Sequence, residues 1–182
     1  MCCSVNSLLD GLTATMLFIM AHNIRRALGI DPGIERLGWG IVEKNDSEIK
    51  RVDSGVKHTS KKDPKSKRLL EIYDFLEKTL KKMKPDFVST EKLFFATNVK
   101  TALTVGEVRG VILLAAERHK VPIIEFAPTE VKMAVCGYGR ATKDNIAAML
   151  KFSMILPQKK LLDDETDALA LALTGLVRRV YP

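Results

Sequence analysis

Cysteine is scarce in this sequence, and it is not arranged for a structural or redox role. Only three cysteines occur among 182 residues, Cys2, Cys3 and Cys136. No two of them have the spacing of a zinc-binding clip or of a dithiol redox motif. We therefore exclude both of these uses, and we expect reduced cysteines in a cytoplasmic protein.

A hydrophobic run long enough for a membrane span is also missing. The apolar stretch 12–21 (LTATMLFIMA) is far shorter than the roughly 20 residues that a membrane-spanning helix needs. No basic stretch precedes it and no convincing small-residue cleavage site follows, so we do not expect a secretory signal. We interpret residues 1–23 as an N-terminal extension, either disordered or the product of an over-early start, with Met20 as the better start.

The chain contains no internal repeat and no low-complexity stretch, and we expect residues 24–182 to form one domain. Hydrophobic residues make up 46% of the sequence, which is ample for one continuous core. Lysine and arginine number 29 against 22 acidic residues, which gives a net charge of +7. That balance suits a polyanionic partner such as nucleic acid, although charge alone does not identify one.

Hydrophobic periodicity predicts five strands and five helices. The first three strands follow one another as an antiparallel meander, and helices and strands alternate after them. This order predicts an α/β layered domain with a mixed five-stranded sheet. The expected strands are 25–31, 37–44, 49–58, 87–93 and 121–126, and the expected helices are 69–83, 100–119, 128–135, 142–155 and 164–177.

Residues 57–68, which join the third strand to the first helix, are unusually basic. They carry six lysines or arginines against one aspartate. We expect a mobile basic loop that is either a solvated surface turn or a contact for phosphate groups, and the sequence favours neither.

The helix 100–119 is apolar nearly all round between residues 108 and 116, which indicates burial on more than one side. Gly106 and Gly110 lie four residues apart and leave room for the close approach of another backbone. Two interpretations remain open: a central core helix of a monomer, or a helix at a dimer interface.

Four acidic residues occupy positions that structure alone does not explain. Asp31 ends a strand expected at the sheet centre, and Glu91 interrupts another buried strand. Burying a carboxylate is costly unless it is paired or bound to a metal. Asp164 and Asp167 are three residues apart at the start of the last helix, so they share one face. Acids at the start of a helix also stabilise the helix dipole. Asp164 and Asp167 alone therefore do not indicate a site, but the set of four acids does.

If these four carboxylates converge, their mutual repulsion raises one or more of their pKa values until a cation neutralises the cluster. Oxygen ligands with no histidine or cysteine nearby favour Mg²⁺ or Mn²⁺ over zinc. Two such ions can activate a water molecule and stabilise the leaving oxygen of a phosphodiester. The acids therefore predict an enzyme that cuts nucleic-acid backbones.

Four segments carry a resemblance to a known family. In this order and spacing, they resemble the RuvC family of crossover-junction endodeoxyribonucleases over about residues 25–175. The resemblance implies an RNase H-like fold, with helices on both faces of the sheet. It also implies a homodimer that cuts two opposed strands of a four-way (Holliday) DNA junction with magnesium, in recombination and repair, beside RuvA and RuvB branch-migration proteins. The segments are LGIDPGIERLGWGIV, TEKLFFATN, TEVKMAVCGYGRATK and DDETDALALAL.

The same resemblance assigns roles to the acids. Asp31, Glu91 and Asp164 correspond to the catalytic metal ligands, and Asp167 is the fourth catalytic acid. Two Mg²⁺ ions per subunit are implied, with Mn²⁺ as a substitute. Asp31 and Asp164 would share one ion, and Glu91 would hold the second. Asp163 offers an alternative register, but the three-residue spacing to Asp167 favours Asp164.

Candidate DNA-binding residues come from the same motifs. Phe94 or Phe95 resembles the family's aromatic that stacks on a base near the junction, a contact worth about 1–3 kcal/mol, and we choose Phe94. Because two adjacent side chains on a strand point to opposite sides, one of the pair could instead fill the core. Lys132 and Lys143 match basic positions that face DNA, and Arg140 lies in the loop between them.

Other functions fit parts of the sequence. The segment GIDPGIERLGWG also resembles the first phosphate-binding hairpin of actin-like and sugar-kinase ATPases, but those need two such domains, more than 182 residues supply. A ribonuclease H acting on RNA–DNA hybrids would share the fold and the metals. A junction-binding protein without catalysis is the non-enzymatic alternative.

Overall fold

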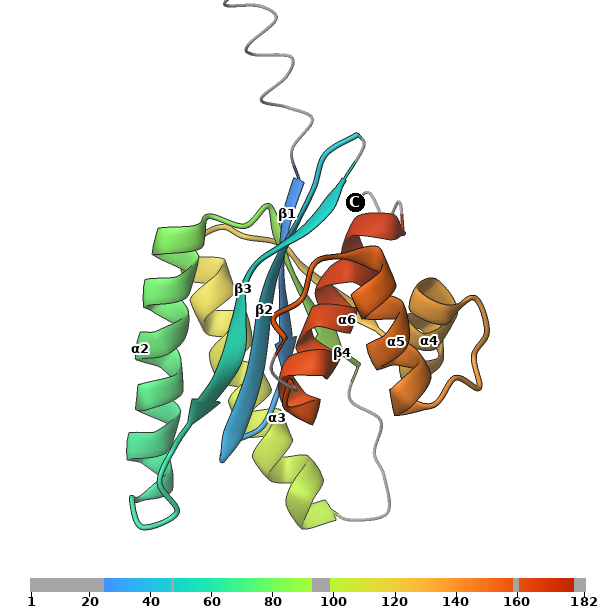
Figure 1. Ribbon diagram of the computed structural model, residues 1–182. Coiled ribbons are helices and arrows are strands. Elements are labelled where there is room, and N and C mark those ends of the chain that lie inside the picture. The colour runs from blue at the N-terminus through green and yellow to red at the C-terminus, as the bar shows by residue number, and fades with distance from the viewer. Residues whose placement is uncertain (1–24, 47, 93–98, 159–160, 179–182) are drawn as a thin grey trace, which may run out of the picture.

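The computed structural model describes residues 25–46, 48–92, 99–158 and 161–178. Within them, five strands form one mixed sheet in the order β3-β2-β1-β4-β5 (Figure 1). The first three strands pair antiparallel as a meander, whereas β4 lies parallel to β1 and β5 parallel to β4. The strands are β1 (Arg25–Asp31), β2 (Arg36–Lys44), β3 (Ile49–His58), β4 (Phe87–Glu91) and β5 (Ile123–Phe126).

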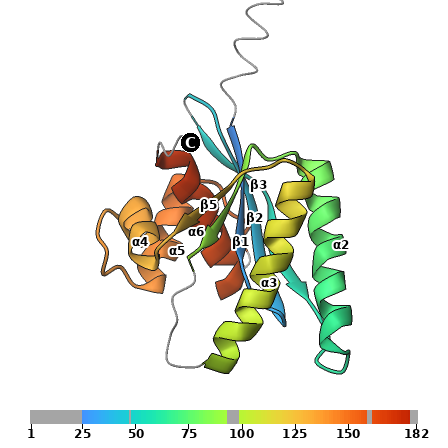
Figure 2. The same ribbon diagram turned by 180° about the vertical axis from the view of Figure 1, so that it is seen from behind.

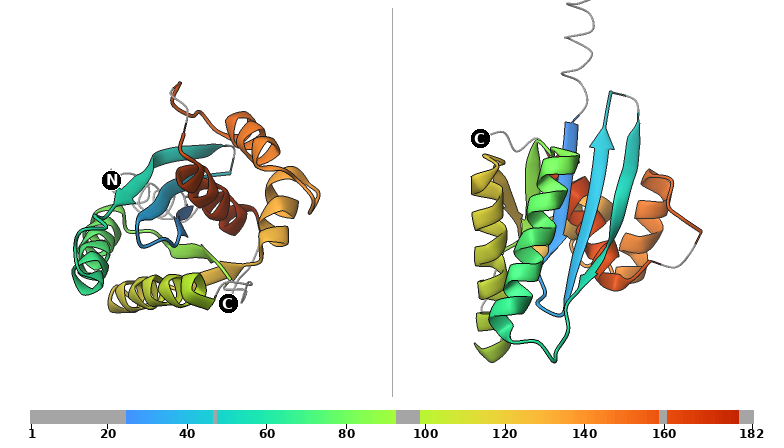
Figure 3. Two further views of the ribbon diagram at one scale, coloured as in Figure 1. Left: turned by 90° about the horizontal axis from the view of Figure 1, so that it is seen from below. Right: turned by 90° about the vertical axis from the view of Figure 1, so that its left-hand side faces the viewer.

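Helices cover both faces of this sheet, and the two views of Figure 3 show them as separate layers. The helices α2 and α3 pack on one face, and α6 packs on the other with α4 and α5 beyond it, as Figure 2 shows from behind. The predicted α/β architecture is therefore confirmed. The helices are α2 (Lys65–Met83), α3 (Val99–Arg118), α4 (Pro128–Cys136), α5 (Lys143–Ser153) and α6 (Asp163–Val177).

The alternation of side chains along β1 decides which of its residues meet α6. Leu28 and Ile30 are fully buried in the core beneath α2 and α3. Ala27 points to the opposite face, into the core shared with α6. Because successive side chains on a strand alternate, Gly29 and Asp31 also face α6. The acid at the end of β1 is therefore directed towards the acidic start of α6.

Glycines let α6 lie unusually close to the sheet. A Cβ atom at Gly29 would overlap with the carbonyl oxygen of Ala168, and one at Gly38 would overlap with that of Asp164. Only hydrogen fits at Gly29 and Gly38, so backbone rests almost directly on backbone there. Gly175, on the helix itself, faces side chains instead, because a Cβ there would overlap with the Phe87 ring and the Ser89 hydroxyl.

The basic segment 57–68 differs from the predicted mobile loop. Lys57 and His58 are the last two residues of β3, and α2 begins at Lys65, four residues earlier than predicted. Several of its cations are paired: Lys61 with Glu35 at 3.0 Å, Lys65 with Glu107 at 3.0 Å and Lys67 with Asp63 at 2.8 Å. The loop prediction was wrong for residues 65–68, where the charges lie on a helix and Lys65 and Lys67 form ion pairs.

Helix α3 buries one side against the sheet and exposes the other. Val108, Ile112, Ala115 and Ala116 are buried, but Leu113 and Leu114 are exposed, so the predicted burial on more than one side is not found among the described residues. Gly110 is exposed instead, and no described atom lies within 4 Å of a Cβ built there. The close backbone approach predicted at Gly110 is therefore absent from the described part of the chain.

We expect Gly29→Ala to lower the free energy of unfolding by at least about 2 kcal/mol, because the added methyl group meets the α6 backbone and not a flexible side chain. Urea denaturation would measure this. Gly139→Ala is the matched control, since a Cβ there has only ordinary contacts, at 3.9 Å or more, with Thr129. Equal stability of the two variants would contradict the packing described here.

Candidate active site

Three elements bring the four predicted acids to one place. Asp31 and Glu91 end the parallel neighbours β1 and β4, directly after the paired residues Ile30 and Thr90. Asp164 and Asp167 lie in the first two turns of α6, whose start packs over Gly38 of β2. The acids thus come from segments up to 136 residues apart in the sequence.

A cavity of about 370 Å³ opens at this point, and we call it the acid cavity. Asp31, Glu91 and Asp167 line it together with Lys132 and Lys143. Asp164 is not part of the lining, although its charge acts on Asp31. The predicted convergence of carboxylates is thus present, with two of the predicted basic residues facing them.

Burial and mutual repulsion perturb two of these acids. Burial, followed by the charges of Asp167, Asp164 and Glu91, raises the pKa of Asp31 from 3.8 to about 7, against the opposing charge of Lys143. Burial and Asp167 likewise raise the pKa of Glu91. Carboxyl groups with raised pKa values are frequent at functional sites.

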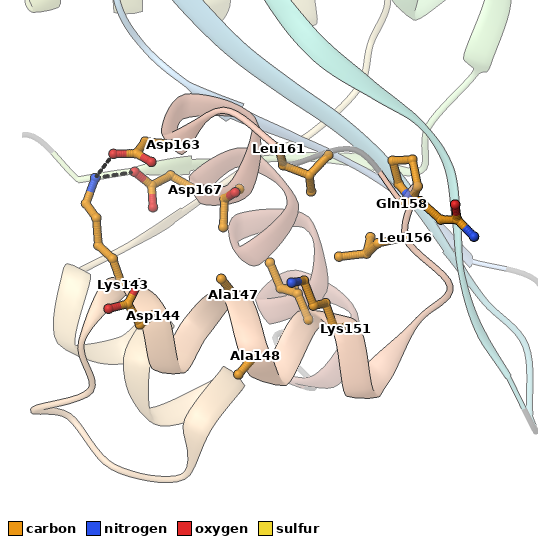
Figure 4. Close-up of a pocket in the computed structure, with 13 residues that line it drawn as sticks. Lys143, Asp144, Ala147, Ala148, Lys151, Leu156, Gln158, Leu161, Asp163 and Asp167 are labelled. Atoms are coloured by element: carbon orange, nitrogen blue, oxygen red, sulfur yellow. Dashed lines mark hydrogen bonds and ion pairs between the residues drawn. The ribbon is translucent and has the colours of Figure 1, made fainter.

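Basic side chains neutralise the acids of α6. Arg36 on β2 contacts Asp164, with 3.0 Å between Nε and Oδ2. Lys143 at the start of α5 lies 3.2 Å from Asp167 and 3.8 Å from Asp163, as the dashed lines in Figure 4 mark. The charge of Asp167 raises the pKa of Lys143, so this lysine remains protonated.

The structure distinguishes between the two candidate registers in the acidic run. The side chain of Asp163 is 72% exposed, whereas that of Asp164 is 18% exposed. Asp164 acts on Asp31 electrostatically, and Asp163 is absent from the charges that act on Asp31. The geometry therefore favours Asp164 as the member of the cluster.

The donor set suits a hard divalent cation. All four side chains offer carboxylate oxygens. Oδ2 of Asp164 is buried and has the ion-pair contact with Arg36 but no hydrogen bond. Among the described residues, however, no group of three acids, histidines or cysteines is arranged to hold an ion as it stands. Arg36 and Lys143 supply the compensating charge in this arrangement, so the carboxylates of α6 would turn away from them to bind a metal.

A buried glutamate, which the sequence analysis did not single out, anchors the start of α6. Glu165 is 4% exposed and accepts a hydrogen bond of 2.6 Å from the Ser54 hydroxyl on β3. Arg51 Nε in turn donates to Ser54 at 2.6 Å. This network fixes the turn that carries Asp164 and Asp167. Acids in a first helical turn usually stabilise the dipole, so no pattern in the sequence marked Glu165.

The candidate DNA-binding residues lie in different settings. Lys132 and Lys143 border the acid cavity. Arg140 is exposed in the loop between α4 and α5 and does not line this cavity. Phe94 and Phe95 lie outside the described residues. The structure therefore brings two of the four predicted residues to the acids.

The sheet order, with carboxylates at the ends of its neighbouring central strands, defines the RNase H-like class of nucleases. The sequence model of the family described as crossover junction endodeoxyribonuclease RuvC matches residues 27–175. The chain belongs to this family. No helix in the described ranges has the length and apolar character to cross a membrane.

Individual relatives agree over nearly their whole length. The crossover junction endodeoxyribonuclease RuvC of Petrotoga mobilis is 48% identical over 155 residues, which cover 85% of this chain and 95% of the relative. That of Brevibacillus brevis is 46% identical, with 86% and 94% covered. The structure of Thermus thermophilus RuvC in complex with a Holliday junction substrate superimposes with a TM-score of 0.80 at 32% identity, over 84% of this chain and 93% of that one.

We expect Asp31→Asn to stabilise the metal-free protein at pH 8 but not at pH 4. Because the folded-state pKa of Asp31 lies near 7, above 3.8, the folded wild type binds more protons than the unfolded chain between these values and loses stability as the pH rises. The gain is on the order of 2 kcal/mol, since each pKa unit corresponds to about 1.4 kcal/mol and solvent at the open cavity weakens the effect.

Urea unfolding in EDTA at both pH values measures this difference. Asp53→Asn, on the exposed side of β3, is the control. A wild type whose stability does not fall between pH 4 and pH 8 relative to Asp31→Asn would contradict the raised pKa.

Proposed function

We propose that this chain is a structure-selective DNA endonuclease that resolves four-way junctions by paired symmetric nicks, in homologous recombination and DNA repair. The observation that carries the proposal is the acid cavity, where carboxylates with raised pKa values face Lys132 and Lys143. Such a site joins hydrolytic chemistry to phosphate binding. Family membership and the likeness to a RuvC bound to a Holliday junction substrate support the choice of DNA.

For the cofactor, we propose two Mg²⁺ ions per subunit, with Mn²⁺ able to substitute. Asp31, Glu91 and Asp164 would hold them, and Asp167 would complete the catalytic set. When bound, the ions supply an activated water and charge stabilisation for the leaving oxygen. The chain's own residues do the rest: Lys143 and Lys132 attract the phosphate, and Lys143 lies close enough to Asp167 to orient it.

For DNA contacts, we propose that Lys132, Lys143 and Arg140 bind backbone phosphates. The two lysines flank the acid cavity, so a phosphate they attract lies beside the carboxylates. Arg140 is exposed on the loop between α4 and α5. We retain Phe94 as the proposed base-stacking residue, on the strength of its motif.

We also propose a homodimer formed through α3. Leu103, Leu113 and Leu114 are 64%, 42% and 57% exposed on this helix, and Gly110 lies in open space. Apolar side chains gathered on one helix with a glycine between them suit close packing against a second copy. From the family resemblance, we also propose that this protein docks with RuvA and RuvB. We propose a cytoplasmic location as well, because DNA and reduced cysteines fit that compartment.

We expect the purified protein to cut a labelled four-way junction at symmetric positions on two opposed strands with Mg²⁺, and to leave a linear duplex intact. EDTA or Asp31→Asn should abolish the cuts, because either removes the metal from the acid cavity. Resolution of the products on a denaturing gel would measure this. Asp53→Asn is again the matched control, because Asp53 lies outside the acid cavity.

The other outcomes have distinct meanings. Cleavage of an RNA–DNA hybrid would indicate a ribonuclease H. Junction binding without any cutting would indicate a binding protein. Single nicks that are never paired across the junction would contradict the dimer.

We expect Lys132→Ala and Lys143→Ala to weaken junction binding in EDTA, and to do so more at low salt. Each lysine that neutralises one phosphate contributes about 0.9 to the slope of log affinity against log salt concentration. Fluorescence anisotropy at several salt concentrations would measure the slope. Lys81→Ala, on the exposed side of α2, is the control, and slopes equal to that control would overturn the assignment.

A further inference from the structure

Arg36, the first residue of β2, is placed so that its side chain meets the start of α6. It lies two residues before Gly38, so both residues face the same side of the sheet. The backbone of Asp164 crosses this side at Gly38, where a Cβ atom would overlap with the Asp164 carbonyl oxygen. The turn before β2 is also tight, since a Cβ at Gly33 would overlap with the carbonyl oxygen of Arg36. The packing of the backbone therefore directs Arg36 to Asp164.

The guanidinium of Arg36 contacts both carboxylate oxygens of Asp164. Its Nη2 group donates a hydrogen bond to Oδ1 at 3.5 Å, and its Nε lies 3.0 Å from Oδ2. Arg36 is absent from the charges that act on Asp31 and on Glu91. Its effect among the three proposed metal ligands is thus confined to Asp164. A metal ion at Asp164 competes with the guanidinium for the same two oxygens, and the two positive charges repel each other.

Arg36 is also free to leave this contact. Its side chain is 53% exposed, whereas that of Asp164 is 18% exposed. Because an ion pair with an exposed partner contributes little to stability, a divalent cation can displace it. The planar fork of N–H groups on an arginine matches phosphate as well as carboxylate. A displaced guanidinium therefore stands at the surface beside the acids, with the shape and charge to bind a phosphate.

We propose that Arg36 exchanges partners: it holds Asp164 in the metal-free protein, and it binds a phosphate of the DNA once a metal ion takes Asp164. This inference rests on the proposed function and its metal ions. Without DNA, Arg36 opposes metal binding, and with DNA bound it no longer does so. Because the coupling between two ligands is reciprocal, the metal should strengthen DNA binding through Arg36 by the same factor.

The first test is the binding of Mn²⁺ alone to the full-length protein, without DNA, by calorimetry at pH 8. We expect Arg36→Ala to bind Mn²⁺ about two- to fivefold more tightly than wild type, because the ion pair no longer competes. Arg36→Lys keeps the charge but loses the fork, so its affinity should lie between the two.

Lys61→Ala is the matched control for the loss of a nearby positive charge. Lys61 is 72% exposed and pairs at 3.0 Å with Glu35, the neighbour of Arg36 in the sequence. Screening by salt weakens the effect of an exposed charge that makes no contact with the site, so this variant should match wild type within about 1.5-fold. Thermal unfolding would confirm that each variant is folded.

The second test is the salt dependence of junction binding, measured by fluorescence anisotropy. In EDTA, wild type and Arg36→Ala should have the same slope of log affinity against log salt concentration, because Asp164 engages the arginine. With Ca²⁺, which carboxylate oxygens also bind, the slope of wild type should be steeper by about 0.9, the contribution of one phosphate contact. Any difference between Lys61→Ala and wild type should be the same in EDTA and in Ca²⁺.

The outcomes separate this inference from the proposed function. Equal Mn²⁺ affinities of Arg36→Ala and Lys61→Ala would overturn the competition, and a weaker affinity of Arg36→Ala would show that Arg36 positions Asp164 for the metal instead. Equal slopes of wild type and Arg36→Ala in Ca²⁺ would overturn the transfer to phosphate. Absence of Mn²⁺ binding by wild type would overturn the proposed cofactor together with this inference. If the effects of Arg36 appear but wild type does not cut the junction, the nuclease function fails while the exchange stands.

Discussion

The contact between α6 and the sheet is the constraint on which the rest of the site depends. Gly29 and Gly38 have no side chain where the helix backbone crosses β1 and β2, so the helix lies at the closest approach that two backbones allow. Its start therefore stands directly over the end of β1. The acids at the start of α6 meet Asp31 because nothing separates the helix from the strand, and a thicker layer would leave them apart.

Bringing these carboxylates close together has an electrostatic cost, which a small number of basic side chains offset. Arg36 and Lys143 balance the acids of α6, but no described residue forms an ion pair with Asp31 or Glu91. Burial, and then the charges of the neighbouring carboxylates, raise the pKa of Asp31. The carboxylates at the ends of β1 and β4 therefore lack a neutralising positive charge, and this lowers the stability of the metal-free protein. A site of this kind gains stability whenever a cation or a proton enters.

Much of this arrangement could be predicted from the sequence, for physical reasons that differ between residues. Asp31 and Glu91 stood out because a carboxylate is costly in a buried strand. The two residues lie together because β1 and β4 run parallel and end at the same edge of the sheet. Asp164 and Asp167 followed from helical spacing.

Other features left no trace in the sequence. Arg36 sits in an ordinary strand pattern, and its partner Asp164 is 128 residues away. Ser54 and Glu165 meet only through tertiary packing. The basic segment 57–68 was misjudged because composition does not show that Lys65 and Lys67 already lie on α2 and form ion pairs, with Glu107 of α3 and with Asp63.

The hydrogen bond between Ser54 and Glu165 has a consequence for how this sequence can change over generations. Loss of the serine alone leaves the buried carboxylate of Glu165 short of a donor, and loss of the glutamate alone leaves the partly buried Ser54 hydroxyl without its acceptor. Either single step is costlier than both together, so the two positions are epistatic. The pair holds the turn that carries Asp164 and Asp167. Sequence change at Ser54 in the edge strand β3, which has no catalytic role, is therefore restricted by the need to keep these acids in place.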